Sequence, residues 1–371
     1  MIPPLFFPRK PFTHDTYTEM ASGFAPHRSL FGPRRIGKTW WLLHDLGPKA
    51  IDYGHRTVYV DFWERGPAPL ALLLYELDKA LQRKSAVGTV LSRAGQLAPR
   101  VKLSALGQEV EIDLTQKPKA LPEDQVLLLD QYLNALASGP RPAFLFFDEF
   151  QEIGKSKGGP ALFAALRASM NRYGAGLAVV FTGSSPDALK RVFSSRKAPF
   201  YRFASPLTLP DLGEDFLRHQ LGFYPKQAPT ITLDDARMVF RHFGDNPEYF
   251  QRWMRMRAVT PDLPHADVIR LIEADLHEEL DFEQTWLDLN DTDRLVLRLI
   301  AEGLDEIYSE AAASRMTALG ASTVPGSSSL QTALNKLSGR NLALAWEQDR
   351  DIADPVFRDW ILARPEADFA R

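Results

Sequence analysis

The chain has 371 residues, of which 45% are hydrophobic and 25% charged, so it can bury sizeable cores in two or three domains. It contains no cysteine, which excludes disulfide bonds, thiolate metal sites and a cysteine nucleophile. The formal net charge of −3 is unevenly spread, with +9 over residues 1–205, −5 over 206–280 and −7 over 281–371. The basic part is compatible with a polyanionic partner, and a solvated basic surface explains it equally well.

The N-terminal sequence MIPPLFFPRK does not resemble a signal peptide. Prolines interrupt its short apolar patch, and Arg9 and Lys10 follow directly, so it has no continuous apolar segment. No window of the chain approaches the roughly 20 apolar residues of a membrane-spanning helix. We therefore expect a soluble, cytoplasmic protein with no membrane association.

Apolar runs of strand length alternate with helix-length segments up to residue 205. The runs are SLF before Gly32, TVYVDF from Thr57, AFLFFD from Ala143 and LAVVFTG from Leu177, and the helical segments are 38–46, 70–81 and 162–170. Because such strands are buried on both faces, the pattern predicts an α/β core with a parallel sheet covered by helices. Within an insertion at about 85–122, the alternating VKLSALGQEVEIDL predicts a β-hairpin, and a helix over 124–137 follows.

Strand patterns nearly vanish after Pro210. Periodicity over 212–221, 233–243 and 247–256 predicts a helical lid, and a proline-containing linker leads to one long acidic helix over 268–286. From residue 290, three short helices followed by two extended runs give the order of a winged helix. We therefore expect three domains: a core over 1–205, a lid and linker helix over 206–287, and a winged helix over 288–371.

The strongest motif is GPRRIGKT, residues 32–39, which fits GxxxxGK[ST] between an apolar strand and a helix. In such a loop the backbone N–H groups point at phosphate oxygens, and the N-terminus of the following helix adds a favourable dipole. Lys38 would reach the β and γ phosphates, and the Thr39 hydroxyl would bind Mg²⁺. We expect the nucleotide, ATP, to be bound by this segment: Gly32, Pro33, Arg34, Arg35, Ile36, Gly37, Lys38, Thr39 and Trp40.

Three residues of this segment have competing interpretations. Arg34 and Arg35 either add positive charge to the nucleotide site, face a partner or are simply exposed, and the sequence leaves this open. Trp40 and Trp41 lie on the helix that follows the loop, where packing explains them better than stacking on a base.

A second motif, FLFFDEF, places Asp148 and Glu149 at the end of a buried strand, where two adjacent carboxylates are costly unless they are used. Asp148 would hold Mg²⁺ directly or through its water, and Glu149 would orient and polarise the attacking water. The motif is weak by itself. Its position about a hundred residues after a P-loop strengthens it.

Two further candidates follow the strand from Leu177. Thr182 is positioned to sense the γ-phosphate, and the alternative is a helix N-cap turn formed by Ser184 or Ser185. The segment SSRKAPFYRF places Arg202 where an arginine finger for a neighbouring subunit is expected. For Arg196 and Lys197 in the same segment, surface charge is the preferred interpretation.

Taken in order, GPRRIGKT, LFFDEFQEI, FTGSS, PFYRF, FGDNPEYF and DPVFRDWI resemble the prokaryotic "archaeal ATPase" group of AAA+ and STAND P-loop ATPases over most of the chain. The resemblance implies an AAA+ core, a lid near residues 243–250 and a winged helix whose last strand leads into DPVFRDW. Many members carry a C-terminal nuclease-like domain, which we do not expect here because the chain stops soon after the winged helix.

Two classes of function fit these observations. The first is an ATPase that couples nucleotide state to oligomerisation and to engagement of duplex DNA or a protein, in a defence, mobile-element or replication system. Because the winged-helix segment is acidic, we expect an oligomer of the basic cores to contact any DNA. The alternative is a STAND-type signalling switch acting on a protein effector without DNA, and a chaperone-like loader is a weaker third reading.

Overall fold

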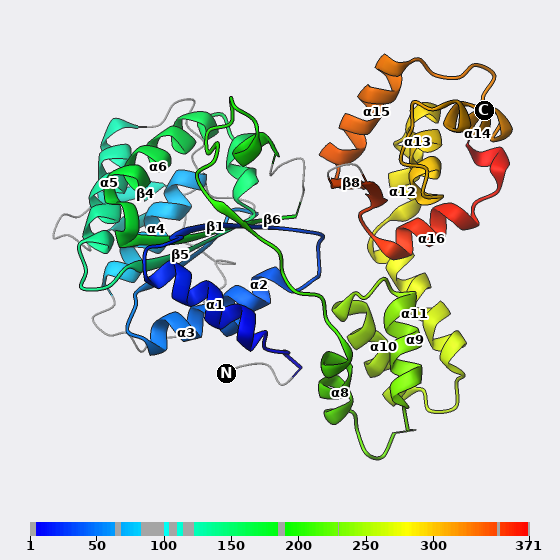
Figure 1. Cartoon of the computed structure of the whole chain (residues 1–371), viewed down its shortest axis with the longest axis horizontal. Coiled ribbons are helices and arrows are strands. Elements are labelled where there is room, and N and C mark those ends of the chain that lie inside the picture. Colours follow the sequence, from blue (N-terminus) through cyan, green and yellow to red (C-terminus); the bar gives the residue numbers. More distant parts are fainter. Residues whose placement is uncertain are drawn as a thin grey trace.

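The computed structural model describes residues 5–63, 68–82, 100–103, 110–113, 122–184, 190–228, 230–346 and 349–369. The N-terminal half forms a sheet with helices on both sides, and the C-terminal half forms a helical column beside it (Figure 1). The sheet has five parallel strands in the order β2-β5-β6-β1-β7. Their bounds are β1 His27–Phe31, β2 Thr57–Asp61, β5 Ala143–Asp148, β6 Leu177–Gly183 and β7 Ser205–Leu207.

The four apolar runs of the sequence are strands β1, β2, β5 and β6, which confirms the predicted parallel sheet covered by helices. Strand β7 was not predicted. It is only three residues long, which is too short to show a period, and it contains Pro206. Proline cannot donate to a neighbouring strand, and β7 lies at the edge of the sheet, where this is tolerated.

Alternate residues of the central strands face two separate helical layers. Phe144 and Phe146 of β5 pack with the first layer, and Leu145 and Phe147 pack with the second, as the two-residue period of a strand requires. The first layer contains α1 (Lys10–Ala21) and a continuous helical segment formed by α2 (Lys38–Trp41), the π-helical η1 (Leu42–Leu46) and α3 (Gly47–Asp52). The second contains α4 (Pro69–Gln82), α5 (Glu123–Ala137) and α6 (Gly159–Tyr173).

The helix predicted over 38–46 continues to Asp52 through a π-helical segment. Pro48 lies at the start of α3, where its ring cannot donate a backbone hydrogen bond, and an inserted π-helical turn accommodates such a residue. Helix α1 was not predicted, because its sequence KPFTHDTYTEMA is polar and has little amphipathic pattern.

The insertion contains the predicted hairpin. Strands β3 (Arg100–Leu103) and β4 (Val110–Asp113) pair antiparallel, with Arg100 opposite Asp113 and Leu103 opposite Val110. The rest of the predicted insertion lies outside the described residues.

The lid contains the three expected helices, α8 (Glu214–Gly222), α9 (Leu233–His242) and α10 (Pro247–Val259). The single long helix predicted over 268–286 is wrong. The structure has α11 (His265–Glu279) and α12 (Phe282–Leu287), separated by Asp281. Asp281 has a φ of 52°, in the left-handed region that a right-handed helix cannot contain.

The C-terminal unit has three helices followed by a two-stranded antiparallel hairpin, the order of a winged helix, and one further helix. Its elements are α13 (Asp291–Ala301), α14 (Glu310–Ala318), α15 (Ser327–Gly339), β8 (Ala343–Trp346), β9 (Asp349–Ile352) and α16 (Pro355–Ala363). One continuous cluster of buried apolar side chains extends from Phe216 in the lid to Phe369. Of the helices in the described ranges, none has the length and apolar character to span a bilayer.

Candidate nucleotide site

The loop after β1 forms one wall of a cavity of about 720 Å³. Strand β1 ends at Phe31 and α2 begins at Lys38, so the motif lies between a buried strand and a helix, as predicted. Gly37 has a φ of 95°, which favours glycine, and a Cβ there would lie 3.4 Å from the Arg9 guanidinium. The volume is within the usual range for small-molecule sites. The loop residues that line the cavity are Arg34, Arg35, Ile36 and Gly37, followed by Lys38, Thr39 and Trp40.

Lys38 is buried at the base of the loop. Its ammonium donates to the carbonyl oxygens of Gly32, at 2.8 Å, and Pro33, at 2.5 Å. Burial lowers the pKa of Lys38 to about 8, and the nearby charges of Glu149 and Asp148 oppose this shift. The side chain is therefore a buried cation at neutral pH, beside both acids of the second motif.

Asp148 accepts three hydroxyl hydrogen bonds from three different elements. Thr39 of α2 and Tyr59 of β2 donate to Oδ2 at 2.6 Å and 3.0 Å, and Thr182 of β6 donates to Oδ1. Because β2 and β6 are the parallel neighbours of β5, Tyr59 and Thr182 reach Asp148 from the strands on either side of it. Asp148 and Thr39 supply adjacent oxygen atoms, which are the ligand type that Mg²⁺ prefers, so the residues fit the predicted metal.

Glu149 follows at the end of β5 and lines the cavity. Its backbone has a φ of 49°, and its Oε2 accepts from the Ser184 hydroxyl at 3.0 Å and from the Gln151 amide. The Gln151 oxygen is buried and has no hydrogen-bond partner among the described residues. A Cβ on Gly183 would lie 2.4 Å from that oxygen, so only glycine leaves room for it. Glu149 is thus held at the cavity by two polar side chains.

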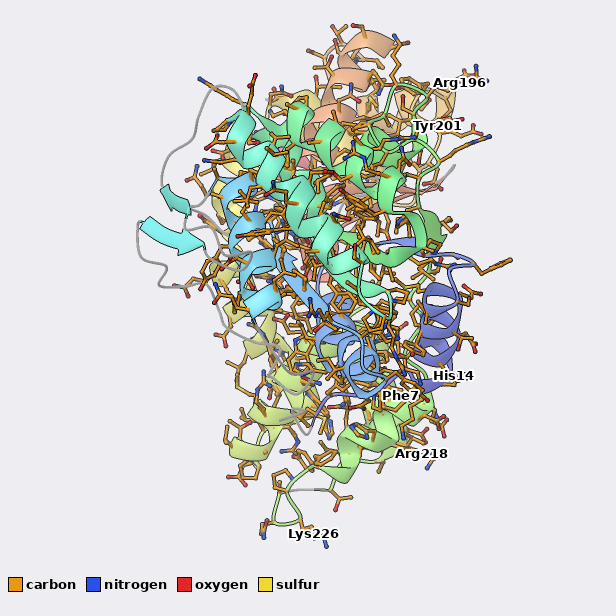
Figure 2. The ribbon with its side chains drawn as sticks, turned by 90° about the vertical axis from the view of Figure 1, so that its left-hand side faces the viewer. Phe7, His14, Arg196, Tyr201, Arg218 and Lys226 are labelled. Atoms are coloured by element: carbon orange, nitrogen blue, oxygen red, sulfur yellow. The ribbon has the colours of Figure 1, made fainter. Side chains whose placement is uncertain are left out.

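The structure separates two of the other predicted catalytic residues from the cavity. Thr182 is fully buried, and its hydroxyl contacts Asp148, while its sensing of a phosphate stays a prediction. Arg202 precedes β7, whose first residue, Ser205, lies beside Arg28 near the start of β1. Arg202 is therefore at the amino-terminal edge of the sheet, whereas the loop follows its carboxyl-terminal edge. Figure 2 shows Tyr201, the neighbour of Arg202, far from Phe7, which lines the cavity.

An apolar part of the cavity was missed by the sequence analysis. Phe6 stacks on Trp40 with ring centroids 6.2 Å apart, and both rings line the cavity with Phe216 of the lid. Trp41 is fully buried in the core, as the packing interpretation expects, whereas Trp40 is 44% exposed and packs on Phe6 at the edge of the cavity. Adjacent positions on a helix point about 100° apart, so Trp40 and Trp41 can face different surroundings. The helical pattern by itself does not say which of the two is buried.

Three charged residues near the cavity were also missed. Arg9 donates to the carbonyl of Ile36 at 3.1 Å and to that of Pro210 at 3.2 Å, so it joins the loop to the chain leading into the lid. Burial lowers the pKa of Arg9 to about 10, which leaves it charged at neutral pH. Asp61 at the end of β2 and Arg255 on α10 also line the cavity. None of them belongs to a local motif.

The structure shows what the two loop arginines contact, and their role toward a nucleotide or a partner stays a prediction. Arg34 lies over the Trp63 ring, 4.6 Å from its centroid. Arg35 points away from the sheet toward the lid and the C-terminal unit, where it contacts Tyr249 and Asp354. Both side chains also line the nucleotide cavity.

No family model matches the sequence, and a search of curated proteins finds no relative. Solved structures are similar over nearly the whole chain. The Walker-type ATPase PABY2304 of Pyrococcus abyssi has a TM-score of 0.64 at 18% identity, with 96% of each chain covered. The ORC2 protein of Aeropyrum pernix in its ADP form has a TM-score of 0.54 at 16% identity, with 98% of this chain and 96% of that one covered. Its ADPNP-ADP complexes give 0.53 at 15% identity, with 96% of each covered.

At such low identities these likenesses establish the fold and leave the activity to the site itself. Because they cover nearly the whole chain, the likeness extends over both the parallel sheet and the helical C-terminal half. The chain therefore has the fold of P-loop ATPases of the AAA+ type.

Proposed function

We propose that this chain binds ATP with Mg²⁺ in the cavity beside the 32–37 loop and hydrolyses it. The observation that carries the proposal is the convergence of Lys38, Thr39, Asp148 and Glu149 on one cavity lined by that loop. The similar Aeropyrum pernix ORC2 protein has been solved in an ADP form and with ADPNP, which supports a nucleotide ligand here. The aromatic part, formed by Phe6 and Trp40, suits the base.

Each polar group has a defined task in this reaction. Lys38 donates to the phosphates in place of the carbonyls of Gly32 and Pro33. Thr39 and Asp148 hold Mg²⁺, which supplies charge neutralisation on the phosphates when bound. Glu149 accepts a hydrogen bond from water and aligns it with the γ-phosphorus. Water gives a proton to Glu149 and forms the new P–O bond as the bond to the β–γ bridging oxygen breaks, which yields ADP and phosphate.

We further propose that nucleotide state controls assembly and partner engagement. Arg202 lies remote from its own cavity, so its predicted role as an arginine finger requires a second copy of the chain. The charge of +9 over residues 1–205 supports duplex DNA as a partner of the core, and the charge of −7 over 281–371 argues against DNA binding by the winged helix. A STAND-type switch acting on a protein effector remains the alternative.

The test is ATP hydrolysis by the wild type and by Glu149→Gln, each with and without duplex DNA, together with sizing in ATP. We expect hydrolysis by the wild type only, and a larger assembly when ATP is bound. Stimulation by DNA supports the DNA-related function. Tight ATP retention with turnover that DNA does not change supports the signalling alternative, and a wild type that does not bind ATP contradicts both.

A further inference from the structure

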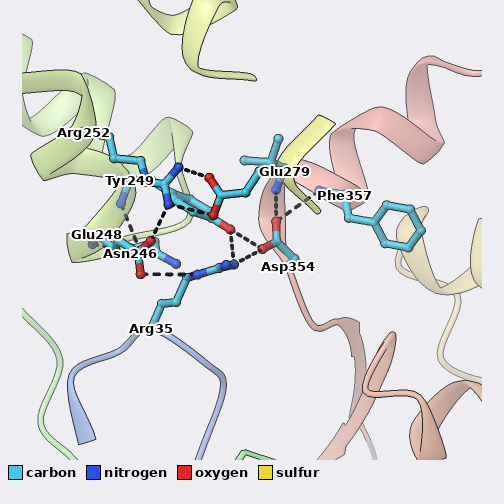
Figure 3. A network of polar contacts seen from close by, with 9 residues as sticks. Arg35, Asn246, Glu248, Tyr249, Arg252, Glu279, Asp354 and Phe357 are labelled. Carbon is cyan, nitrogen blue, oxygen red and sulfur yellow. Dashed lines mark hydrogen bonds and ion pairs between the residues drawn. The ribbon is translucent and has the colours of Figure 1, made fainter. Parts of the chain in front are cut away.

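Arg35 connects the nucleotide loop to the lid and to the C-terminal unit. Its guanidinium donates to the Tyr249 hydroxyl at 2.8 Å and forms ion pairs with Glu248 at 3.3 Å and Asp354 at 3.4 Å (Figure 3). Arg35 also has a φ of 65°, an unfavourable value for a residue other than glycine. One side chain in a conformationally sensitive loop therefore contacts two distant parts of the chain.

Asp354 is the C-terminal partner, and it also caps a helix. Its Oδ1 accepts from the backbone N–H groups of Val356 at 2.9 Å and Phe357 at 3.2 Å, at the N-terminus of α16. Its Oδ2 faces Arg35 and accepts the Tyr249 hydroxyl. Burial and the nearby Asp354 raise the pKa of Tyr249, so this hydroxyl stays a neutral donor. Any movement of Arg35 relative to Asp354 thus acts directly on the start of α16.

The lid is fixed to the C-terminal unit independently of Arg35. A Cβ on Gly244, before α10, would lie 2.8 Å from the Pro355 Cβ, so the two backbones approach closely. Tyr249 of α10 donates to Asp354 of the C-terminal unit, and within the lid and linker Arg252 of α10 pairs with Glu248 and with Glu279 of α11. With the continuous apolar cluster, these contacts make the lid and the C-terminal unit one body. In this network only Arg35 comes from the nucleotide loop.

A bound triphosphate changes the charge balance at Arg35. Both Arg35 and Glu248 line the nucleotide cavity. The phosphates would attract the Arg35 guanidinium and repel the carboxylates of Glu248 and Asp354, so they would compete with these acids for the same cation. Binding also requires Lys38 to leave the carbonyls of Gly32 and Pro33, which changes the loop that sets the Arg35 backbone.

We propose that the Arg35–Asp354 contact is an autoinhibitory contact: it holds the C-terminal half against the nucleotide loop, and a triphosphate releases it by competing for Arg35. This inference rests on the proposed function, because it requires a triphosphate in the cavity. By thermodynamic reciprocity, the contact weakens triphosphate binding by the same factor by which the triphosphate weakens the contact, so removing the contact should strengthen triphosphate binding.

The test uses Asp354→Asn, which removes the carboxylate charge and keeps a good helix N-cap. We expect MgATP to bind roughly fivefold more tightly to this variant, the low end of usual coupling between sites. Asp359→Asn is the matched control. Asp359 lies on the same helix and pairs with the neighbouring Arg358, so its variant should bind MgATP like the wild type.

A second readout follows the domain arrangement without relying on ATP. The chain has no cysteine, so Asn171→Cys on α6 and Ser329→Cys on α15, both exposed, accept spin labels specifically. We expect a narrow distance distribution in the wild type without nucleotide, and a broader or longer one on adding MgATP. Asp354→Asn should show the broader distribution before any nucleotide is added, and Asp359→Asn should not.

The outcomes separate the two proposals. An Asp354→Asn variant with the wild-type distance distribution and wild-type MgATP affinity overturns the autoinhibitory contact. Another outcome is a distance distribution that broadens in Asp354→Asn while the wild type binds no MgATP. That result overturns the proposed function and the competition for Arg35, and it supports the Arg35–Asp354 contact between the two halves. MgATP binding that leaves the wild-type distances unchanged overturns release by the triphosphate.

Discussion

The two halves of the molecule are each held together by apolar contacts, whereas near the cavity they are joined by polar side chains together with Phe7, which packs against Phe216 of the lid. In the N-terminal half, helices cover both faces of an apolar sheet, and Phe150 lies at the centre of an aromatic cluster. In the C-terminal half, one apolar cluster includes both the lid and the C-terminal unit. Arg9 and Arg35 reach across between the halves from the N-terminal side.

This difference indicates where movement can occur. Apolar contacts are lost when two surfaces separate, and that costs free energy in proportion to the area exposed. A charged contact can instead be exchanged for another charge, such as a phosphate, at little net cost. We therefore expect the lid and the C-terminal unit to move as one body relative to the sheet, with the contacts of Arg35 changing as they move. The three predicted domain boundaries stay a prediction.

The largest expected effect is on catalysis, and it leaves both halves intact. Glu149→Gln should lower kcat by about 10²-fold or more, because the amide cannot accept the proton of the attacking water. Nucleotide affinity and stability should stay close to wild type, since glutamine can still accept from Ser184. Steady-state hydrolysis and calorimetry measure the two quantities. The control is Glu152→Gln, a nearby acid paired with Lys155, and an equal loss there would contradict the assignment.

The next effect tests the apolar side of the comparison. Phe150 is fully buried and packs against Phe147, Phe181 and Phe200, so Phe150→Ala should cost about 3–5 kcal/mol of unfolding free energy. Denaturant unfolding measures it. Phe223→Ala, at a 50% exposed site in the lid, should change stability little. Equal losses of unfolding free energy in both variants would show that the aromatic cluster stabilises the fold no more than an exposed side chain does.

A smaller effect concerns the hydroxyls that hold Asp148. Tyr59→Phe removes one of the three hydroxyl donors to this carboxylate and keeps the ring, and we expect a loss of about 1 kcal/mol in Mg²⁺ binding. This corresponds to a roughly fivefold higher Mg²⁺ concentration for half-maximal activity. Titration of activity with Mg²⁺ checks it. If the Mg²⁺ requirement is unchanged, Tyr59 does not position Asp148.

The smallest effect lies in the C-terminal half and depends on pH. The hydrogen bond to Glu273 raises the pKa of His242 above its ordinary value of 6.5. The stabilisation from this pair is therefore fully present below pH 6.5 and is lost as the pH rises through the folded-state pKa. Because His242 is partly exposed, we expect only a fraction of a kcal/mol. Unfolding across this pH range should show the loss in the wild type and not in His242→Gln.

Short sequence motifs were sufficient to predict those parts of the candidate site whose residues are consecutive in the chain. The glycine loop with Lys38 and the acids at the end of a fully apolar strand both show in a few consecutive residues, and parallel pairing then brings them together. The sheet and most helices follow from periodicity for the same reason. The break at Asp281 was missed because a single left-handed residue does not disturb an apolar period.

Contacts between distant segments could not be predicted. Nothing in the sequence near Arg9, Tyr59 or Asp354 identifies its partner, because each contact depends on how whole elements pack. Asp354 before Pro355 reads only as the start of a helix, and its second role with Arg35 exists only after the C-terminal half has docked. The exposure of Trp40 likewise depends on where the N-terminal segment lies.

The central claim is that the 32–37 loop and Lys38 bind a nucleoside triphosphate. Calorimetric titration of MgATP into the wild type and into Lys38→Ala tests it most directly, with Lys155→Ala, an exposed lysine, as the control. We predict one site in the wild type and in Lys155→Ala, and at least about tenfold weaker binding in Lys38→Ala, because a charged hydrogen-bond donor to the phosphates is lost. Equal affinity in all three proteins would contradict the account.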